Sequence, residues 1–532
     1  MTPHADTRAA RGLVYTLLIG LAVGLSLGRI ASVERVVEPS VHRADTDTTT
    51  PRPAWPSKRP EPWPTFGSND RARWALARAL VEEGTFVVGR RDRTVVVCSG
   101  PAVLAATNPF AASCLLAAGY QARISSDRGI IFEEGWQSVD KVLHPARLEY
   151  YSTKPPLLSL LVAGEYWLLK NYLGWSLVEQ RWEIVRLTLV VFNVLPLIVY
   201  LLCLSALAER LASSDWARYY LLAAAGFATL VTPFLISLNN HTVATVAVAV
   251  ALYAVIRTRE GGGLAWPMLA GLAAGFAGVN ELPSFALVAA LAFWLLLAGH
   301  RAGLLVYVLA VLLPVAAYLG TNYLQLERLT PAYAEFGTVW YEYEGSHWRI
   351  PEGQTKRGID FARRNGETWQ TYAFHLTLGH HGWFSLTPIM FLGLVGLLLG
   401  MFTALARLAS GSSISDSPDR VGNVIAPLSG FDRLLLFSLT LLMSLVVFAF
   451  YLLKSDNYGG WSNGPRWLMW LTPLWLLGML PLLDRLAGSR LGRFVALVLL
   501  VASILSMSYQ LWNPWRHPWI YNWMESRGWI SY

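Results

Sequence analysis

The sequence predicts an all-α polytopic membrane protein of about 11–13 transmembrane helices. Its 532 residues are 54% hydrophobic and 15% charged, whereas an ordinary soluble domain is nearer a quarter charged. At least eleven apolar segments of roughly 16–26 residues recur between Leu13 and Leu511, long enough to cross ~30 Å of hydrocarbon. Conspicuous polar clusters fall at one set of segment ends and most spare arginines at the other. A soluble core is therefore excluded.

The first region, residues 1–31, is expected to be a cytoplasmic tail followed by the first transmembrane helix. Arg8 and Arg11 precede an apolar run from Leu13 to Ile30. A signal peptide and an anchor both fit this pattern. Because no small-x-small cleavage site is clear and many spans follow, we expect an uncleaved anchor.

Residues 32–153 are expected to form the first outer loop. Residues 32–64 are rich in proline, threonine and charge, which is typical of an extended linker. Residues 68–83 predict a helix that Ser68 or Asn69 caps and Gly84 ends. This helix is too short and polar to span, so we expect it to lie on the membrane surface.

A small extramembrane insertion is expected within that outer loop, over residues 85–135, because short β-like runs alternate there with turns. Cys98 and Cys114 lie in it. If the loop is exported, they could form a disulfide worth roughly 3 kcal/mol. Free thiols are the equal alternative.

The rest of the chain divides into a transmembrane bundle (154–323, the catalytic half), a second outer loop (324–383), C-terminal transmembrane helices (384–511) and an outer tail (512–532) that contains five tryptophans. The predicted later spans are 156–173, 184–208, 219–238, 242–257, 264–279, 282–299, 304–323, 384–405, 434–453, 467–484 and 492–511.

The basic residues predict orientation. The net charge of +8 is spread over short loops, which does not indicate nucleic-acid binding. Arginine-rich loops stay in the cytoplasm, so the polar clusters, the second outer loop and the tail are expected outside. Segment 156–173 breaks this alternation. Either it is re-entrant, or the spans between 156 and 208 are miscounted.

Asp70 is the first candidate for chemistry. It opens the predicted surface helix, where the helix dipole favours the ionised carboxylate. Such a group could act as a general base or a metal ligand. The alternative is that Asp70 only caps its helix.

Lys154 is the second candidate. Pro155 and Pro156 follow it and fix the entry to an apolar helix, which would hold the ammonium at the depth of lipid headgroups and near a phosphate. Tyr151 beside it is a further candidate for substrate binding. The alternative is a lysine that extends to the interface without a ligand.

Polar residues also interrupt the apolar spans at Asn239-Asn240-His241 and at Asn280-Glu281. Polar groups at membrane depth usually face a cavity or a partner, so Asn240, His241 and Glu281 are candidates for substrate binding. Arg466 ends a tight glycine-rich loop and could bind a phosphate or carboxylate. Helix-end hydrogen bonding and structural turns are the alternatives. Adjacent His380 and His381 could be simple interfacial residues and predict no metal site by themselves.

Together these motifs resemble the GT-C superfamily of membrane glycosyltransferases, and are most similar to the protein O-mannosyltransferases and the lipid A aminoarabinose transferase. That group carries an Asp-Glu-x-Arg-Tyr-Ala stretch in its first outer loop, matched by Asn69-Asp70-Arg71-Ala72-Arg73-Trp74-Ala75. It also carries Lys-Pro-Pro-Leu, matched by Lys154-Pro155-Pro156-Leu157. The likeness covers residues 68–300 in detail. A further family acid falls near Asn239-Asn240-His241, where no carboxylate stands.

The resemblance implies a GT-C-like fold and transfer of a sugar from a polyprenyl-phosphate donor to a lipid, glycan or protein acceptor. The site would face the periplasm or cell exterior from a multi-pass cell-membrane protein. Asp70 would be the catalytic base, and Lys154, with Arg466, would contact the donor phosphate. No nucleotide is implied, and a divalent cation is the one cofactor left open. The alternative classes are a transporter or flippase for a lipid-linked glycan and a non-catalytic scaffold subunit.

Overall fold

The computed structural model describes residues 3–36, 54, 61–91, 95–97, 103–105, 121–123, 127–350, 352–356, 358–410, 428–455 and 457–532. Cys98 and Cys114 lie outside these residues. The chain forms two compact units. Unit 1 comprises Met1–Val33, Arg186–Ala316 and Gly353–Tyr532, and unit 2 comprises Glu34–Val185 and Ala317–Glu352.

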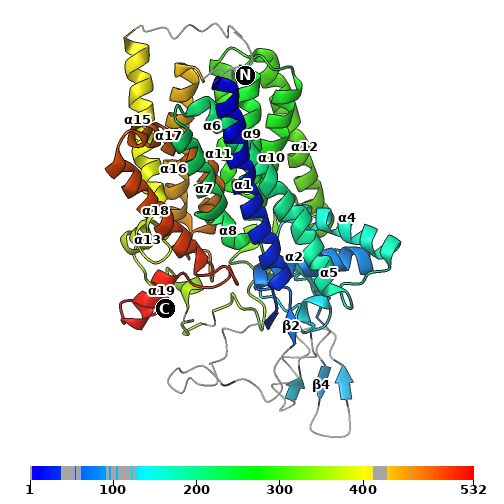
Figure 1. Ribbon diagram of the computed structural model, residues 1–532. Coiled ribbons are helices and arrows are strands. Elements are labelled where there is room, and N and C mark those ends of the chain that lie inside the picture. The colour runs from blue at the N-terminus through cyan, green and yellow to red at the C-terminus, as the bar shows by residue number, and fades with distance from the viewer. Residues whose placement is uncertain are drawn as a thin grey trace. The chain divides into compact units, whose positions relative to one another are not determined.

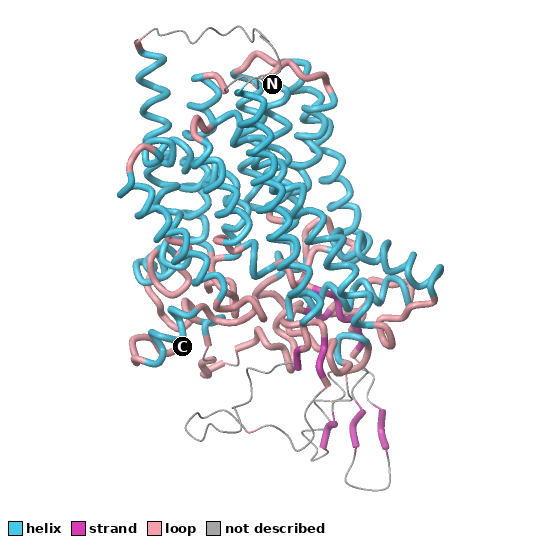
Figure 2. The backbone as a smooth tube through the Cα atoms, in the orientation of Figure 1, coloured by secondary structure: helices cyan, strands magenta, loops and turns pink. Residues whose placement is uncertain are grey.

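Unit 1 is a bundle of helices that run side by side (Figures 1 and 2). Its first part contains α1 (Pro3–Ser32), α6 (Leu195–Leu211), α7 (Asp215–Phe227), the short α8 (Val231–Phe234), α9 (Asn240–Arg259), α10 (Ala265–Asn280) and α11 (Phe285–Leu297). The later part contains α13 (Trp369–Thr377), α14 (Trp383–Leu386), α15 (Ile389–Ala409), α16 (Gly430–Lys454), α17 (Thr472–Ala487), α18 (Arg490–Ser508) and α19 (Trp519–Ser526). Two helices continue from one unit into the other, α5 (Arg181–Leu189) and α12 (Arg301–Leu326).

Eight helices of the described chain are long and apolar enough to cross a membrane. One shorter apolar helix, Leu282–Leu297, which contains α11, accompanies them in the described chain. The predicted class, an all-α polytopic membrane protein, agrees with this arrangement. The sequence prediction of about 11–13 spans exceeds these eight, because it counts the segments 156–173, 219–238, 264–279 and 282–299 as full spans.

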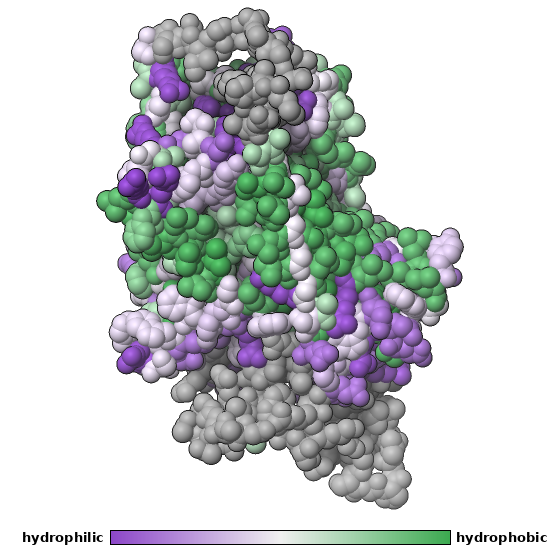
Figure 3. Space-filling view, in the orientation of Figure 1, coloured by the Kyte–Doolittle hydropathy of each residue, from purple (hydrophilic) through white to green (hydrophobic). Residues whose placement is uncertain are grey.

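The central helices of unit 1 are α9 and the segment Arg466–Ala487. In the most apolar stretch of each, 72% and 78% of the residues are buried, respectively. In the most apolar stretch of α1 only 17% of the residues are buried, so this helix presents apolar side chains outward. Leu13, Leu17 and Leu21 of α1 are exposed, and Figure 3 shows a broad hydrophobic surface on the helical bundle. Such a surface fits contact with lipid.

The two ends of unit 1 differ in charge. At one end, the arginine end, Arg11 contacts Asp215, Arg210 contacts Glu260, and Arg259 contacts Asp432. At the opposite end, which we call the His241 end, α9 begins at Asn240 and α10 ends at Asn280. Within this unit these contacts agree with the sequence prediction that most spare arginines lie at the helix ends opposite the other polar clusters.

Chain direction within unit 1 resolves the parity problem of segment 156–173. Helix α1 starts at the arginine end and finishes where the carbonyl of Val33 accepts a hydrogen bond from Arg186. The chain therefore leaves unit 1 after Val33 and re-enters at Arg186 from the same end. No net crossing is needed between these residues, and α4 (Pro156–Leu173) is absent from the described helices that qualify as spans.

Unit 2 combines helices with short antiparallel strands. Helix α2 (Ser68–Glu82) packs on α4, where Tyr166 donates a hydrogen bond to Glu82. One sheet has the order β3-β8-β7, formed by Gly89–Arg90, Glu149–Ser152 and Lys141–Leu143. A second has the order β5-β4-β6, formed by Val103–Ala105, Val95–Val97 and Gln121–Arg123, and β1 (Arg35–Val36) pairs with β2 (Pro62–Trp63).

Helix α2 confirms the predicted element over residues 68–83, but its surroundings differ from the prediction. It is buried from Asn69 to Ala79 on all faces, so it is not a surface helix with an exposed polar face. The buried charges are tolerated because they have partners: Arg73 contacts the carbonyl of Asn69, and Arg78 contacts Glu82 and Glu133.

Close helix packing in unit 1 depends on glycine. A methyl group at Gly396 of α15 would collide with the carbonyl oxygen of Gly478 on α17, and backbone atoms cannot move aside as a side chain can. We therefore predict that Gly396→Ala lowers the stability of the purified protein by about 1–3 kcal/mol. Thermal unfolding in detergent measures the change.

Gly24→Ala in α1 is the matched control, because a methyl group there meets nothing within 4 Å. Its melting temperature should stay at or above the wild-type value. Equal melting temperatures for Gly396→Ala and wild type would contradict the packing described here.

Candidate functional site

The predicted site residues fall into two clusters, one in each unit. Asp70, Lys154 and Tyr151 belong to unit 2, and Asn240, His241, Glu281 and Arg466 belong to unit 1. Each cluster is built by contacts inside its own unit.

Asp70 lies in the first turn of α2 and caps that turn. Its residue is 1% exposed. Oδ1 accepts hydrogen bonds from the backbone N–H groups of Gly67 (2.8 Å) and Arg71 (3.0 Å), and Oδ2 accepts one from Phe66 (3.0 Å). The helix N-cap is Gly67 rather than Ser68 or Asn69. Asp70 therefore does help to cap its helix, as the alternative interpretation of the sequence predicts.

Although Asp70 caps the helix, its carboxylate can still accept one further hydrogen bond or a proton. A carboxylate offers about four lone-pair sites, and the backbone occupies three, which leaves one on Oδ2. Burial raises the pKa of Asp70, and the N–H groups together with Arg71 offset this only in part. Burial therefore outweighs the favourable effect of the helix start on ionisation that the sequence predicts. A raised pKa suits a general base near neutral pH.

Lys154 lies immediately before α4 and is paired. Its Nζ lies 2.8 Å from Oδ1 of Asp140, and the side chains are 17% and 14% exposed. Tyr151 is buried, and its hydroxyl donates to Glu149 at 2.7 Å. Tyr151 also packs in an aromatic core with Trp340 and Tyr341, a placement that favours a structural role for it.

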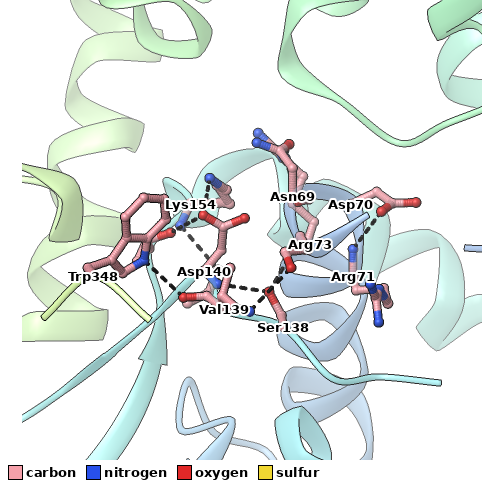
Figure 4. A network of polar contacts seen from close by, with 12 residues as sticks. Asn69, Asp70, Arg71, Arg73, Ser138, Val139, Asp140, Lys154 and Trp348 are labelled. Carbon is pink, nitrogen blue, oxygen red and sulfur yellow. Dashed lines mark hydrogen bonds and ion pairs between the residues drawn. The ribbon is translucent and has the colours of Figure 1, made fainter. Parts of the chain in front are cut away.

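A short loop connects the Asp70 helix with the Lys154 pair (Figure 4). Ser138 Oγ donates to the carbonyl of Ser68 at 2.8 Å, and the N–H of Val139 bonds Ser68 Oγ at 3.3 Å. The next residue is Asp140, whose N–H bonds Ser138 Oγ at 3.0 Å. The loop therefore ties the start of α2 to the carboxylate that holds Lys154.

The unit 1 cluster brings together four predicted residues that are distant in sequence. Arg466 contacts Nε2 of His241 at 2.6 Å, and Nδ1 of His241 contacts Glu281. Asn240 donates to Glu281 and to the carbonyl of Asn280. Because a guanidinium can only donate, Nε2 of His241 accepts, and the proton of the neutral ring lies on Nδ1, next to Glu281. The contacts select one neutral tautomer.

Two hydrogen-bonded asparagines hold the turn before α9. Asn239 caps the helix through Thr242 N–H at 2.9 Å, which confirms helix-end bonding for this residue. Asn193 donates to the carbonyls of Leu235 and Ser237 and accepts from Thr242. Asn193 lies in a π-helical turn, Val190–Val194, between α5 and α6. These bonds fix the position of His241.

His380 and His381 are buried rather than interfacial, which corrects the sequence interpretation. Their Nδ1 atoms lie 2.6 Å apart, and Nε2 of His380 lies 2.8 Å from the hydroxyl of Tyr532. That hydroxyl donates to Glu367 at 3.0 Å, so Nε2 of His380 must donate to it. Nδ1 of His380 then accepts the proton of His381, and both rings are neutral.

The sequence singled out only His380 and His381 of this cluster, because the other members come from residues 367–375, Tyr458 and the tail. His375 stacks on His380 with ring centroids 4.0 Å apart, and His517 stacks on Tyr521 at 3.8 Å. The only usable signal was the concentration of histidine and tyrosine in otherwise apolar surroundings. Among the described residues, no three His, Cys, Asp or Glu side chains are grouped to hold a metal ion.

Comparison with models of known protein families and with curated proteins finds no match to this chain.

The buried histidines predict loss of stability in acid. Burial lowers the pKa of His375 to about 4, below the ordinary value of about 6.5. Between these values the unfolded chain binds a proton that the folded chain does not, so stability is complete above pH 6.5 and falls as the pH falls. At pH 5 the loss for such a residue is about 2 kcal/mol. Thermal unfolding at pH 7.5 and 5.0 measures it.

His375→Phe keeps an aromatic ring and removes the titrating group, so its melting temperature should fall less between these pH values. The comparison isolates His375 from Glu367, whose raised pKa acts in the opposite direction. An equal fall in both proteins would contradict the prediction.

Proposed function

We propose that this protein is a membrane glycosyltransferase. It moves a sugar from a polyprenyl-phosphate donor to a lipid, glycan or protein acceptor at the outer face of the cytoplasmic membrane. The observation that supports this best is the unit 2 arrangement. There, a buried carboxylate with one open lone-pair site and a lysine at the start of an apolar helix lie on elements joined by the Ser138–Asp140 loop.

The chemistry follows from these two groups. The acceptor hydroxyl or amine attacks the anomeric carbon while the bond from that carbon to the phosphate oxygen breaks. Asp70 takes the acceptor proton, and the polyprenyl phosphate leaves with the bonding electron pair. Lys154 offsets the charge that grows on this phosphate. A single displacement of this kind inverts the anomeric configuration.

Unit 1 supports the proposal in a different way. Its helices offer an apolar environment for a polyprenyl chain, and its intramembrane polar groups gather at one end. Asn240, His241, Glu281 and Arg466 all lie at the His241 end. A transporter would need polar groups along a path through the bilayer, so this distribution gives the transporter alternative less support. Binding of substrate by these four residues remains a prediction.

Asp70→Asn tests the catalytic role. Asparagine keeps the shape, and its one oxygen can still accept from Gly67 and Arg71, but its NH2 group cannot accept from Phe66 and the side chain cannot take a proton. We predict that sugar transfer by the purified protein, supplied with a lipid-linked donor and an acceptor, falls by ~10²-fold or more. Loss of the Phe66 hydrogen bond should lower the stability by about 1–3 kcal/mol, so transfer is measured at a temperature where thermal unfolding shows that the variant is folded.

The matched control is Asp127→Asn, which removes another partly buried carboxylate of unit 2, bound to Arg91 at 2.9 Å. Turnover should survive in this control. Near-normal turnover in Asp70→Asn would show that Asp70 is only a cap.

Orientation is tested by labelling single cysteines in a background from which the three native cysteines are removed. Gln354 is exposed in the segment that the arginine distribution places outside. We predict that a cysteine at position 354 reacts with an impermeant thiol reagent on intact cells, whereas one at Gly263, in the α9–α10 turn at the arginine end, reacts only after lysis. The reverse pattern would overturn the outer-face site.

A further inference from the structure

We propose that Asp140 is a positioning residue that holds Lys154 in a closed ion pair which the donor phosphate must open. Asp140 thereby limits how tightly the anionic lipid binds before reaction. Lys154 then gains its full contact only as charge builds on the departing phosphate. This inference rests on the proposed function and names the residue that sets donor affinity.

The pair is enclosed and geometrically defined. Lys154 Nζ and Asp140 Oδ1 lie 2.8 Å apart, with both side chains largely buried. Thr153 Oγ1 approaches the same oxygen at 3.5 Å, and the N–H of Thr153 bonds the carbonyl of Asp140 at 3.0 Å. The hairpin of β7 and β8, which pairs Lys141 with Ser152, creates this proximity.

Asp140 is the fixed member of the pair (Figure 4). Its loop is bonded to Ser68 of α2 through Ser138 and Val139, and Trp348 Nε1 donates to the carbonyl of Val139 at 3.1 Å. The Lys154 side chain is a long flexible stem. Opening the pair therefore requires movement of the lysine, and the carboxylate stays where it is.

A fixed carboxylate next to the phosphate site has two opposing effects. It holds the Lys154 side chain in one orientation, and it repels an arriving phosphate and competes for the same ammonium. Because the paired lysine gives little net attraction to the bound donor, its contact strengthens mainly in the transition state. Interactions of that kind raise the rate rather than the affinity.

The test uses undecaprenyl monophosphate as the probe, with uncharged undecaprenol as its control, and measures binding to the detergent-purified full chain. We predict that Asp140→Asn binds the phosphate about tenfold more tightly than wild type, equivalent to about 1.4 kcal/mol. Asp140→Glu, which keeps the charge, should stay near wild type. Lys154→Met should bind more weakly, and Asp140→Asn in the Lys154→Met background should recover part of that loss.

Asp127→Asn is the control for general damage to unit 2, since it breaks the Arg91 pair at 2.9 Å. Its melting temperature should fall while its affinity for the probe stays unchanged. In transfer assays, Asp140→Asn should lower both KM for the donor and kcat, because the freed lysine holds substrate and product too tightly. A purely structural residue would not lower KM.

The inference is overturned if Asp140→Asn binds the phosphate no more tightly than wild type, or if wild type does not prefer the phosphate to undecaprenol. If neither Asp140→Asn nor Asp140→Glu folds, the test is whether the double variant binds the phosphate more tightly than Lys154→Met alone. If it does not, the inference is also overturned. Failure of the proposed function looks different. Wild type would then show the predicted binding order but transfer no sugar from any lipid-linked donor.

Discussion

Charges that enter an apolar protein interior must be paired, and this constraint shapes both units. An unpaired buried ion costs several kcal/mol, and removal of one partner leaves the other exposed to that cost. In unit 1, Arg466, His241 and Glu281 satisfy one another in a single chain of contacts. In unit 2, Lys154 and Asp140 do the same. Each group of charges is consequently held in one geometry.

The hydrogen bonds and the burial of Asp70 also explain how one residue can have a structural role and a chemical role together. Asp70 gives three lone-pair sites to backbone N–H groups and is therefore rigid. The same burial raises its pKa, which moves the carboxyl toward the range of a general base. A general base needs both a fixed position and a suitable pKa. The first turn of α2 provides the two together.

Features set by local pattern could be predicted from the sequence. Hydropathy located the eight long helices, although it also counted four shorter segments as spans. The capping pattern and Gly84 located α2, which the structure ends at Glu82, with Gly84 in a left-handed conformation. The Lys154-Pro155-Pro156 motif located the start of α4. Each depends on residues close in sequence, where spacing alone carries the information.

Contacts between distant segments could not be predicted in this way. Asp140 became significant only through the hairpin register that places it beside Thr153 and Lys154, and no motif specifies that register. The histidine cluster depends on His380 meeting Tyr532, 152 positions away. The same applies to the burial of α2, because its sequence shows a polar face whose partners lie on other segments.

The most direct test of the account is a structure of the protein in a lipid nanodisc with undecaprenyl monophosphate bound. The account predicts phosphate density within hydrogen-bonding distance of Lys154 Nζ, with the Lys154–Asp140 pair opened beyond its present 2.8 Å and Asp140 unmoved. Phosphate bound elsewhere, with this pair still closed, would contradict both the assigned donor site and the role given to Asp140.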